Sequence, residues 1–239
     1  MLQNNIIKVA KETISNEARA IEELINLLDQ DFTAAVEHIY NAKGRVIITG
    51  IGKSAIIATK IVATLNSTGT PAIFMHAADA IHGDLGTIQE DDVVICISKS
   101  GNTPEIKVLV PLIKNFKNTL IAITGNKDSF LGKQSDYVLN AYVEKEACPN
   151  NLAPTTSTTA QLVMGDALAV SLLHLRGFSS KDFAKYHPGG ALGKKLYLRV
   201  SDITKENQKP QVSPDTNITD VIVEISEKML GVTAVVEEN

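Results

Sequence analysis

The stretch RVIITGIGKSAIIATKIVATLN (residues 45–66) decides the fold. Its β-branched start predicts a strand over 45–50, its glycines predict a tight turn, and residues 54–66 predict a helix. The same unit recurs downstream. We expect strands at AIFMH (72–76), VVICIS (93–98), LIAITG (120–125) and YVLNAY (137–142), with helices over 104–116 and 128–133. Strands that alternate with helices predict an α/β protein with a parallel sheet, whose ligands gather at the carboxyl ends of the strands.

Helical spacing also extends outside this core. Apolar residues predict amphipathic helices over 6–28 and 33–41, a long helix over 157–176 and a short one over 180–185. The segment HPGGALGKKL (187–196) is too rich in glycine for regular structure. A polar stretch follows from residue 201, and then a short helix and strand. We therefore expect one domain over 1–200 and a small segment over 201–239.

Composition excludes several classes of protein. The chain has 239 residues, a net charge of −4, 44% apolar and 21% charged residues. This charge favours no nucleic-acid partner. No apolar run approaches the length of a membrane span, and the N-terminus lacks the pattern of a signal peptide, so we expect a cytoplasmic protein. Cys96 and Cys148 are too few for a disulfide framework and indicate no redox or metal role.

The turn Gly50-Ile51-Gly52-Lys53-Ser54 follows a strand and opens a helix, a setting that attracts anions. A nucleotide P-loop would need glycine where Ile47 stands. A dinucleotide site would need an acidic residue about 20 positions later, and none is there. A phosphosugar loop in which Lys53 reaches the substrate is favoured, with a plain tight turn as the alternative.

The segment Ser98-Lys99-Ser100-Gly101-Asn102-Thr103-Pro104-Glu105 predicts a phosphate site most clearly. Pro104 suits the first position of a helix, and Thr103 suits its N-cap. Hydroxyls and free backbone N–H groups there can hold a phosphate dianion. A capped helix without a ligand is the alternative, and Glu105 could simply favour the helix dipole.

Other polar residues are less decisive. Five hydroxyl residues, 155–159, precede the long helix, and more of them are present than one cap needs. His76 and His82 flank a turn at the end of a strand, where we favour substrate contact over zinc ligation. His187 lies in an irregular segment and is a candidate functional residue. Glu146 lies in a loop, where a solvated side chain is the alternative.

Several of these segments occur in the order typical of one family. Besides the two loops above, they are HAADAIHGDLG (76–86), KEACPNNLAPTTSTTAQLVMGDALAV (145–170) and DFAKYHPGGALGKKL (182–196). Together they resemble the sugar-isomerase (SIS) domain of the arabinose-5-phosphate isomerase family over about residues 10–200. The resemblance implies a five-stranded parallel sheet in a three-layer α-β-α sandwich, and a homotetramer with shared active sites. It also implies interconversion of D-ribulose 5-phosphate and D-arabinose 5-phosphate, which supplies Kdo for lipopolysaccharide or capsule.

The resemblance also assigns residues. Its catalytic groups fall on Lys53, Glu105, Glu146 and His187. Its substrate contacts fall on Ser54, Gly69, Thr70, His76, His82, Ser98, Ser100, Thr103, Thr156, Ser157 and Thr158. No metal is required, and His76 is a candidate inhibitory zinc site. Lys99 and Asn102 depart from the family's usual loop and could shift phosphate or hydroxyl recognition.

Family members usually continue into two cystathionine-β-synthase (CBS) regulatory motifs. Residues 201–239 resemble the opening of the first motif, so we expect no regulation through a complete pair.

Aldose–ketose isomerisation proceeds through an enediol and needs no redox cofactor. We expect Glu105 or Glu146 as the base, His187 to assist ring opening or proton transfer, and Lys53 to stabilise the enediolate. The alternatives are an isomerase of another phosphosugar and a non-catalytic phosphosugar sensor. A sensor of this kind commonly carries a DNA-binding helix-turn-helix, for which the N-terminal helix offers no basic face.

Overall fold

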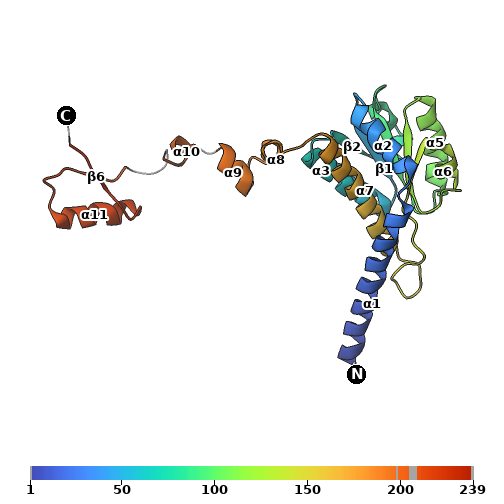
Figure 1. Cartoon of the computed structure of the whole chain (residues 1–239), viewed down its shortest axis with the longest axis horizontal. Helices are drawn as coiled ribbons and strands as arrows, with labels where there is room; N and C mark the ends of the chain where they lie inside the picture. The colour runs from blue at the N-terminus through green and yellow to red at the C-terminus, as the bar shows by residue number, and fades with distance from the viewer. Residues whose placement is uncertain (1, 198, 205–208, 238–239) are drawn as a thin grey trace. The chain divides into compact units, whose positions relative to one another are not determined.

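The computed structural model describes residues 2–197, 199–204 and 209–237. It divides into two compact units, Met1–Phe183 and Ala184–Asn239. The first unit contains five parallel strands in the order β2-β1-β3-β4-β5 (Figure 1). They are β1 (Val46–Gly50), β2 (Ala72–His76), β3 (Val93–Ile97), β4 (Leu120–Thr124) and β5 (Tyr137–Asn140). The predicted α/β class and all five predicted strands are confirmed.

Helices cover both faces of this sheet because successive strand residues point to opposite sides. Ile48 and Ile95 pack on one side, and Ile47, Val94 and Cys96 pack on the other. The first side is covered by α1 (Leu2–Glu23), the 3₁₀ helix η1 (Leu24–Leu27), α2 (Gln30–Asn41), α3 (Lys53–Ser67) and α7 (Thr156–Leu175). The second side is covered by α4 (Ala77–Ala80), η2 (Asp84–Thr87), α5 (Pro104–Asn115) and α6 (Phe130–Gln134). This is the predicted three-layer sandwich.

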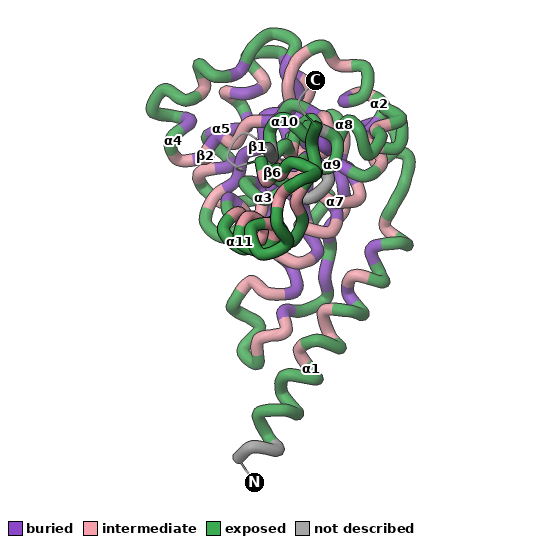
Figure 2. Tube along the Cα trace, turned by 90° about the vertical axis from the view of Figure 1, so that its left-hand side faces the viewer, coloured by how far each residue is buried: buried purple, intermediate pink, exposed green. Residues whose placement is uncertain are grey.

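Two helices have surfaces that the sheet does not bury. Helix α1 extends beyond the sheet, and its N-terminal half is exposed (Figure 2). Helix α7 is long and apolar enough in composition to span a membrane, although no such run was expected from the sequence. Its residues Met164 and Leu168 lie in the core, and Asp166 pairs with Lys60 of α3. Packing against α3 and the sheet therefore explains much of the apolar character of α7.

The second unit contains short elements only. The helix α8 (Ser180–Tyr186) joins the two units, and α9 (Ala191–Tyr197), α10 (Val200–Thr204) and α11 (Ile218–Lys228) follow, with a two-stranded parallel ladder of β6 (Gln211–Val212) and β7 (Ala234–Val235). The predicted boundary near residue 200 lies within this unit.

One expectation about this unit is wrong. The segment 187–196 was predicted to lack regular structure, yet α9 begins at Ala191. Gly189 and Gly190 precede the helix, and Gly193 is its one internal glycine, among strong helix formers such as alanine, leucine and lysine.

An ion pair joins the starts of two neighbouring strands. Asp92, which is 3% exposed, precedes β3, and its carboxylate accepts hydrogen bonds from Arg45 Nη2 at 2.7 Å and from the backbone N–H groups of Arg45 and Gln89. Burial raises the pKa of Asp92, but the Arg45 guanidinium and the two N–H groups outweigh burial, so the net pKa is lowered. The charged form of Asp92 therefore stabilises the native state.

We predict that Asp92→Asn lowers the free energy of unfolding by about 1–3 kcal/mol at pH 7. Because the folded-state pKa lies below the unfolded one, this stabilisation is complete above the unfolded pKa and is lost as the pH falls through the folded pKa. The difference in free energy of unfolding between wild type and variant, measured by urea denaturation, should become smaller below about pH 4. A gap of constant size in acid would contradict this account.

Candidate active site

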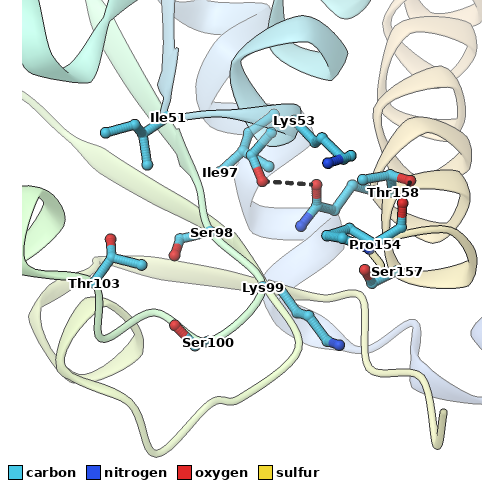
Figure 3. Close-up of a pocket in the computed structure, with 12 residues that line it drawn as sticks. Ile51, Lys53, Ile97, Ser98, Lys99, Ser100, Thr103, Pro154, Ser157 and Thr158 are labelled. Carbon is cyan, nitrogen blue, oxygen red and sulfur yellow. Dashed lines mark hydrogen bonds between the residues drawn. The ribbon is translucent and has the colours of Figure 1, made fainter. Parts of the chain in front are cut away.

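A pocket of about 270 Å³ opens at the carboxyl ends of β1 and β3 (Figure 3). The chain leaves β1 toward β2 on one side, whereas β3 lies on the other side, so the loops that follow the two strands diverge. Open α/β sheets bind ligands at such a position. The pocket is lined by Ile51, Lys53, Ser54, Ile97, Ser98, Lys99, Ser100, Thr103, Pro154, Ser157, Thr158 and Gln161.

The loop 98–103 is held in place by contacts with the start of helix α6. Gly101 has φ +63°, and a Cβ there would lie 2.0 Å from Ser129 Oγ, so only glycine fits. Its carbonyl accepts the N–H of Leu131 at 3.0 Å. The side chain of Asn102 donates to Ser100 O at 3.1 Å and accepts the N–H of Phe130 at 3.0 Å. Helix α6 therefore holds this loop in one conformation.

This loop presents hydrogen-bond donors to the pocket. Ser98 Oγ accepts the N–H of Gly101 at 3.2 Å, and Ser100 Oγ accepts the N–H of Asn102 at 3.3 Å, which leaves each O–H able to donate. Thr103 is the predicted N-cap of α5, and Pro104 takes its first position. However, the Thr103 side chain makes no cap bond, and its buried Oγ1 has no hydrogen-bond partner among the described residues. Hydroxyl donors beside a helix N-terminus suit a phosphate group.

The turn between β1 and α3 supplies a cation. Gly52 has φ +58°, a conformation that glycine adopts without strain, and it is the N-cap of α3. Lys53 follows as the first helical residue and is exposed at the pocket. Ser54 Oγ donates to Gln161 Oε1 at 3.1 Å, the dashed line in Figure 3, which joins α3 to α7 across the pocket wall.

Glu146 lies behind the opposite wall, with its side chain fully buried. Its Oε1 accepts from Ser157 Oγ at 2.5 Å and from Lys99 Nζ at 2.6 Å. Its Oε2 accepts from the N–H of Thr155 at 2.8 Å, the N–H of Ser157 at 3.1 Å and Thr155 Oγ1 at 3.3 Å. The carboxylate therefore binds the first turn of α7.

These contacts determine the charge of Glu146. Burial raises its pKa, but Lys99, the Ser157 hydroxyl and the two backbone N–H groups lower it by more, to about 2. Glu146 is thus an ionised carboxylate at neutral pH, and both of its oxygens already accept hydrogen bonds.

The structure brings together seven of the predicted site residues. Lys53, Ser54, Ser98, Ser100, Thr103, Ser157 and Thr158 all line the pocket. Glu146 touches the lining residues Lys99 and Ser157 without lining the pocket itself. Thr156 is buried at the start of α7, and Glu105 is half-buried in the first turn of α5.

Five predicted residues are not among those that line this pocket. Thr70 precedes β2 at the amino end of the sheet, where its Oγ1 accepts from Arg176 Nε at 3.3 Å. At Gly69 a Cβ would lie 2.6 Å from the Phe178 ring. His76 ends β2, with Nδ1 3.5 Å from Asp79 Oδ2, and His82 is exposed after α4. His187 belongs to the second unit.

No group of three His, Cys, Asp or Glu side chains that could hold a metal ion occurs in the described part of the chain. The zinc contact at His76 stays a prediction.

Five of the lining residues were not predicted as site residues from the sequence: Ile51, Ile97, Lys99, Pro154 and Gln161. Gln161 could have been found, because it lies one turn after Ser157 and Thr158 on the same helix face. Lys99 was noted only as a departure from the family's loop. Its contact with Glu146, 47 positions away, depends on the packing of two loops that sequence spacing does not reveal.

Known proteins are similar to this chain over most of its length. The family model "SIS domain" matches residues 38–171. The arabinose 5-phosphate isomerase KdsD of Pseudomonas aeruginosa is 49% identical over 241 residues, which cover 100% of this chain and 74% of that protein. The chain belongs to the arabinose 5-phosphate isomerase family. The KdsD of Francisella tularensis is 51% identical over 98% of this chain and 72% of its own length.

A solved structure of the family has a comparable fold. The E. coli CFT073 protein c3406, in complex with arabinose 5-phosphate, superposes with a TM-score of 0.76 at 41% identity. The match covers 79% of this chain and 100% of that one.

We predict that Gly101→Ala weakens the binding of inorganic phosphate and raises KM for a phosphosugar about tenfold, since the new Cβ would displace the hydroxyl loop from Ser129. Isothermal titration and steady-state kinetics measure the two effects. Gly177→Ala is the matched control, because Gly177 has φ +60°, no atom within 4 Å of the position that a Cβ would take, and no place in the pocket. It should lower stability alone, and equal effects of both variants on KM would refute the assignment.

Proposed function

We propose that this chain interconverts D-ribulose 5-phosphate and D-arabinose 5-phosphate. The observation that carries the proposal is the pocket between β1 and β3, with Lys53 on one side and the hydroxyl loop 98–103 on the other. The family relationship supports the substrate, since KdsD proteins are named for this sugar phosphate and c3406 is described in complex with it.

The polarity of the pocket fits such a substrate. The hydroxyls of Ser98, Ser100 and Thr103, with the start of α5, would hold the phosphate group. Lys53 would then stabilise the negative oxygen of the enediolate that forms when a proton leaves the carbon beside the carbonyl.

Proton transfer needs a base, and Glu105 and Glu146 were the two expected candidates. The contacts of Glu146 favour Glu105 as the base, because the Glu146 carboxylate has a pKa of about 2 and accepts hydrogen bonds on both oxygens. A base works best when its pKa lies near the working pH. In this proposal Glu146 organises the pocket wall, and His187 assists ring opening or proton transfer.

The direct test incubates the protein with ribulose 5-phosphate in a chelating buffer and follows arabinose 5-phosphate by NMR. We expect conversion, and a fall of at least about 100-fold in kcat for Lys53→Ala, which removes the cation that faces the developing charge. Lys60→Ala on the same helix is the matched control, since Lys60 pairs with Asp166 outside the pocket.

Turnover of a different phosphosugar alone would move the proposal to another isomerase of this fold. Binding without turnover would favour a phosphosugar sensor. Equal activity of the two lysine variants would refute the role of Lys53.

We also propose a homotetramer whose active sites are shared between copies. The pocket has no histidine among its lining residues, and Gly69 and Thr70, two of the predicted substrate contacts, lie at the other end of the sheet. Exposed apolar side chains support association. They include Ile6 (63% exposed) and Ile14 (69%) on α1 and Val170 (57%) on α7.

Mixing two inactive variants tests the shared site. If Lys53 and His187 of one site come from different copies, unfolding and refolding Lys53→Ala with His187→Ala should restore about a quarter of the sites. If both residues come from the same copy, no site regains both groups and no activity returns. Light scattering gives the oligomeric state of each preparation.

A cytoplasmic location and a role in supplying Kdo for lipopolysaccharide or capsule complete the proposal. Both rest on the family relationship.

A further inference from the structure

Lys99 lies on the boundary between the pocket and the buried Glu146. Its backbone is fixed, because its carbonyl accepts the N–H of Gly125 at 3.0 Å and the hydroxyl of Thr124 at 3.3 Å at the end of β4. Its side chain is 49% exposed, whereas that of Glu146 is 0% exposed. In Figure 3 the amine extends away from Ser100 and toward the side where Ser157 lies.

Although Lys99 belongs to the hydroxyl loop 98–103, its side chain points away from the hydroxyls of that loop. Its ammonium group contacts Glu146 Oε1 at 2.6 Å. The other donors to that carboxylate, from Thr155 and Ser157, are uncharged. A buried carboxylate without a counter-charge favours its protonated form. Lys99 thus supplies the positive charge that this site requires.

No other charged group of the described residues is recorded in contact with Glu146. Its neighbours Glu144 and Lys145 are exposed and lie with Arg19 and Glu23 around a different pocket. The thiol of Cys148 accepts N–H groups of its own loop at 3.4 Å.

We propose that Lys99 is a positioning residue for the isomerisation: it keeps Glu146 ionised and bound to the first turn of α7, and thereby holds Ser157 and Thr158 in the pocket wall. Protonation of Glu146 would place a hydrogen where a donor now binds, and would release either Ser157 or a backbone N–H. The inference rests on the proposed isomerase function for its kinetic effect, but the coupling of Lys99 to Glu146 is independent of it.

The kinetic test compares wild type, Lys99→Met and Lys99→Arg from about pH 3 to 9, a range that includes the values to which the pKa of Glu146 would rise from about 2. Without the cation the pKa of Glu146 rises, by about one to three units. We expect Lys99→Met to lose kcat/KM at a higher pH than wild type does, and Lys99→Arg, which keeps the charge, to follow wild type. Lys114→Met is the matched control, because it removes an exposed pair with Asp136 outside the pocket and should leave the profile unchanged.

A double-mutant cycle at pH 7 tests the same coupling without any activity. Lys99→Met and Glu146→Gln should each lower the midpoint of thermal unfolding, and the double variant should be no less stable than Glu146→Gln alone. Additive losses would overturn the proposal. So would a rise in KM of equal size at every pH that persists in the Glu146→Gln background, because it would mean that Lys99 contacts the substrate directly. If wild type is inactive, the isomerase proposal fails while the cycle still tests the pair.

Discussion

The strand order β2-β1-β3-β4-β5 is the constraint on which the rest of the site depends. Because the chain turns to opposite sides after β1 and β3, the loops that follow these strands cannot close over each other. The crevice between them receives two helix N-termini, those of α3 and α5, without any net basic surface. A protein with a net charge of −4 can therefore offer an anion site in one place.

The pocket wall formed by the start of α7 depends on the buried charge of Glu146. Glu146 binds the start of α7 through backbone N–H groups and hydroxyls, and the Lys99 cation offsets its burial. The side chain of Lys99 therefore extends toward Glu146 and away from Ser100 in the hydroxyl loop 98–103 (Figure 3). The proposed mechanism gives the two carboxylates different roles because their environments differ. Glu146 is ionised and accepts hydrogen bonds on both oxygens, whereas Glu105 lies half-buried at the start of α5.

Much of the fold was predictable from sequence because it depends on local patterns. β-Branched runs indicated all five strands, and the placement of Thr103 and Pro104 at the start of α5 followed from capping preferences. The hydroxyl-rich segments 98–103 and 155–159 were also recognised from local sequence patterns. The contact between Lys99 and Glu146 was not predictable in this way, because it joins the loops after β3 and β5, which are 47 positions apart in the sequence. The α9 helix was not predicted because glycines precede and interrupt it, although the alanine, leucine and lysine residues within it favour a helix.

The most direct test of the account is a crystal structure of the full chain with arabinose 5-phosphate. The account predicts the phosphate group against the hydroxyls of Ser98, Ser100 and Thr103, the sugar directed toward Lys53, and the Lys99 amine still on Glu146. A phosphate bound outside the crevice between β1 and β3 would contradict it.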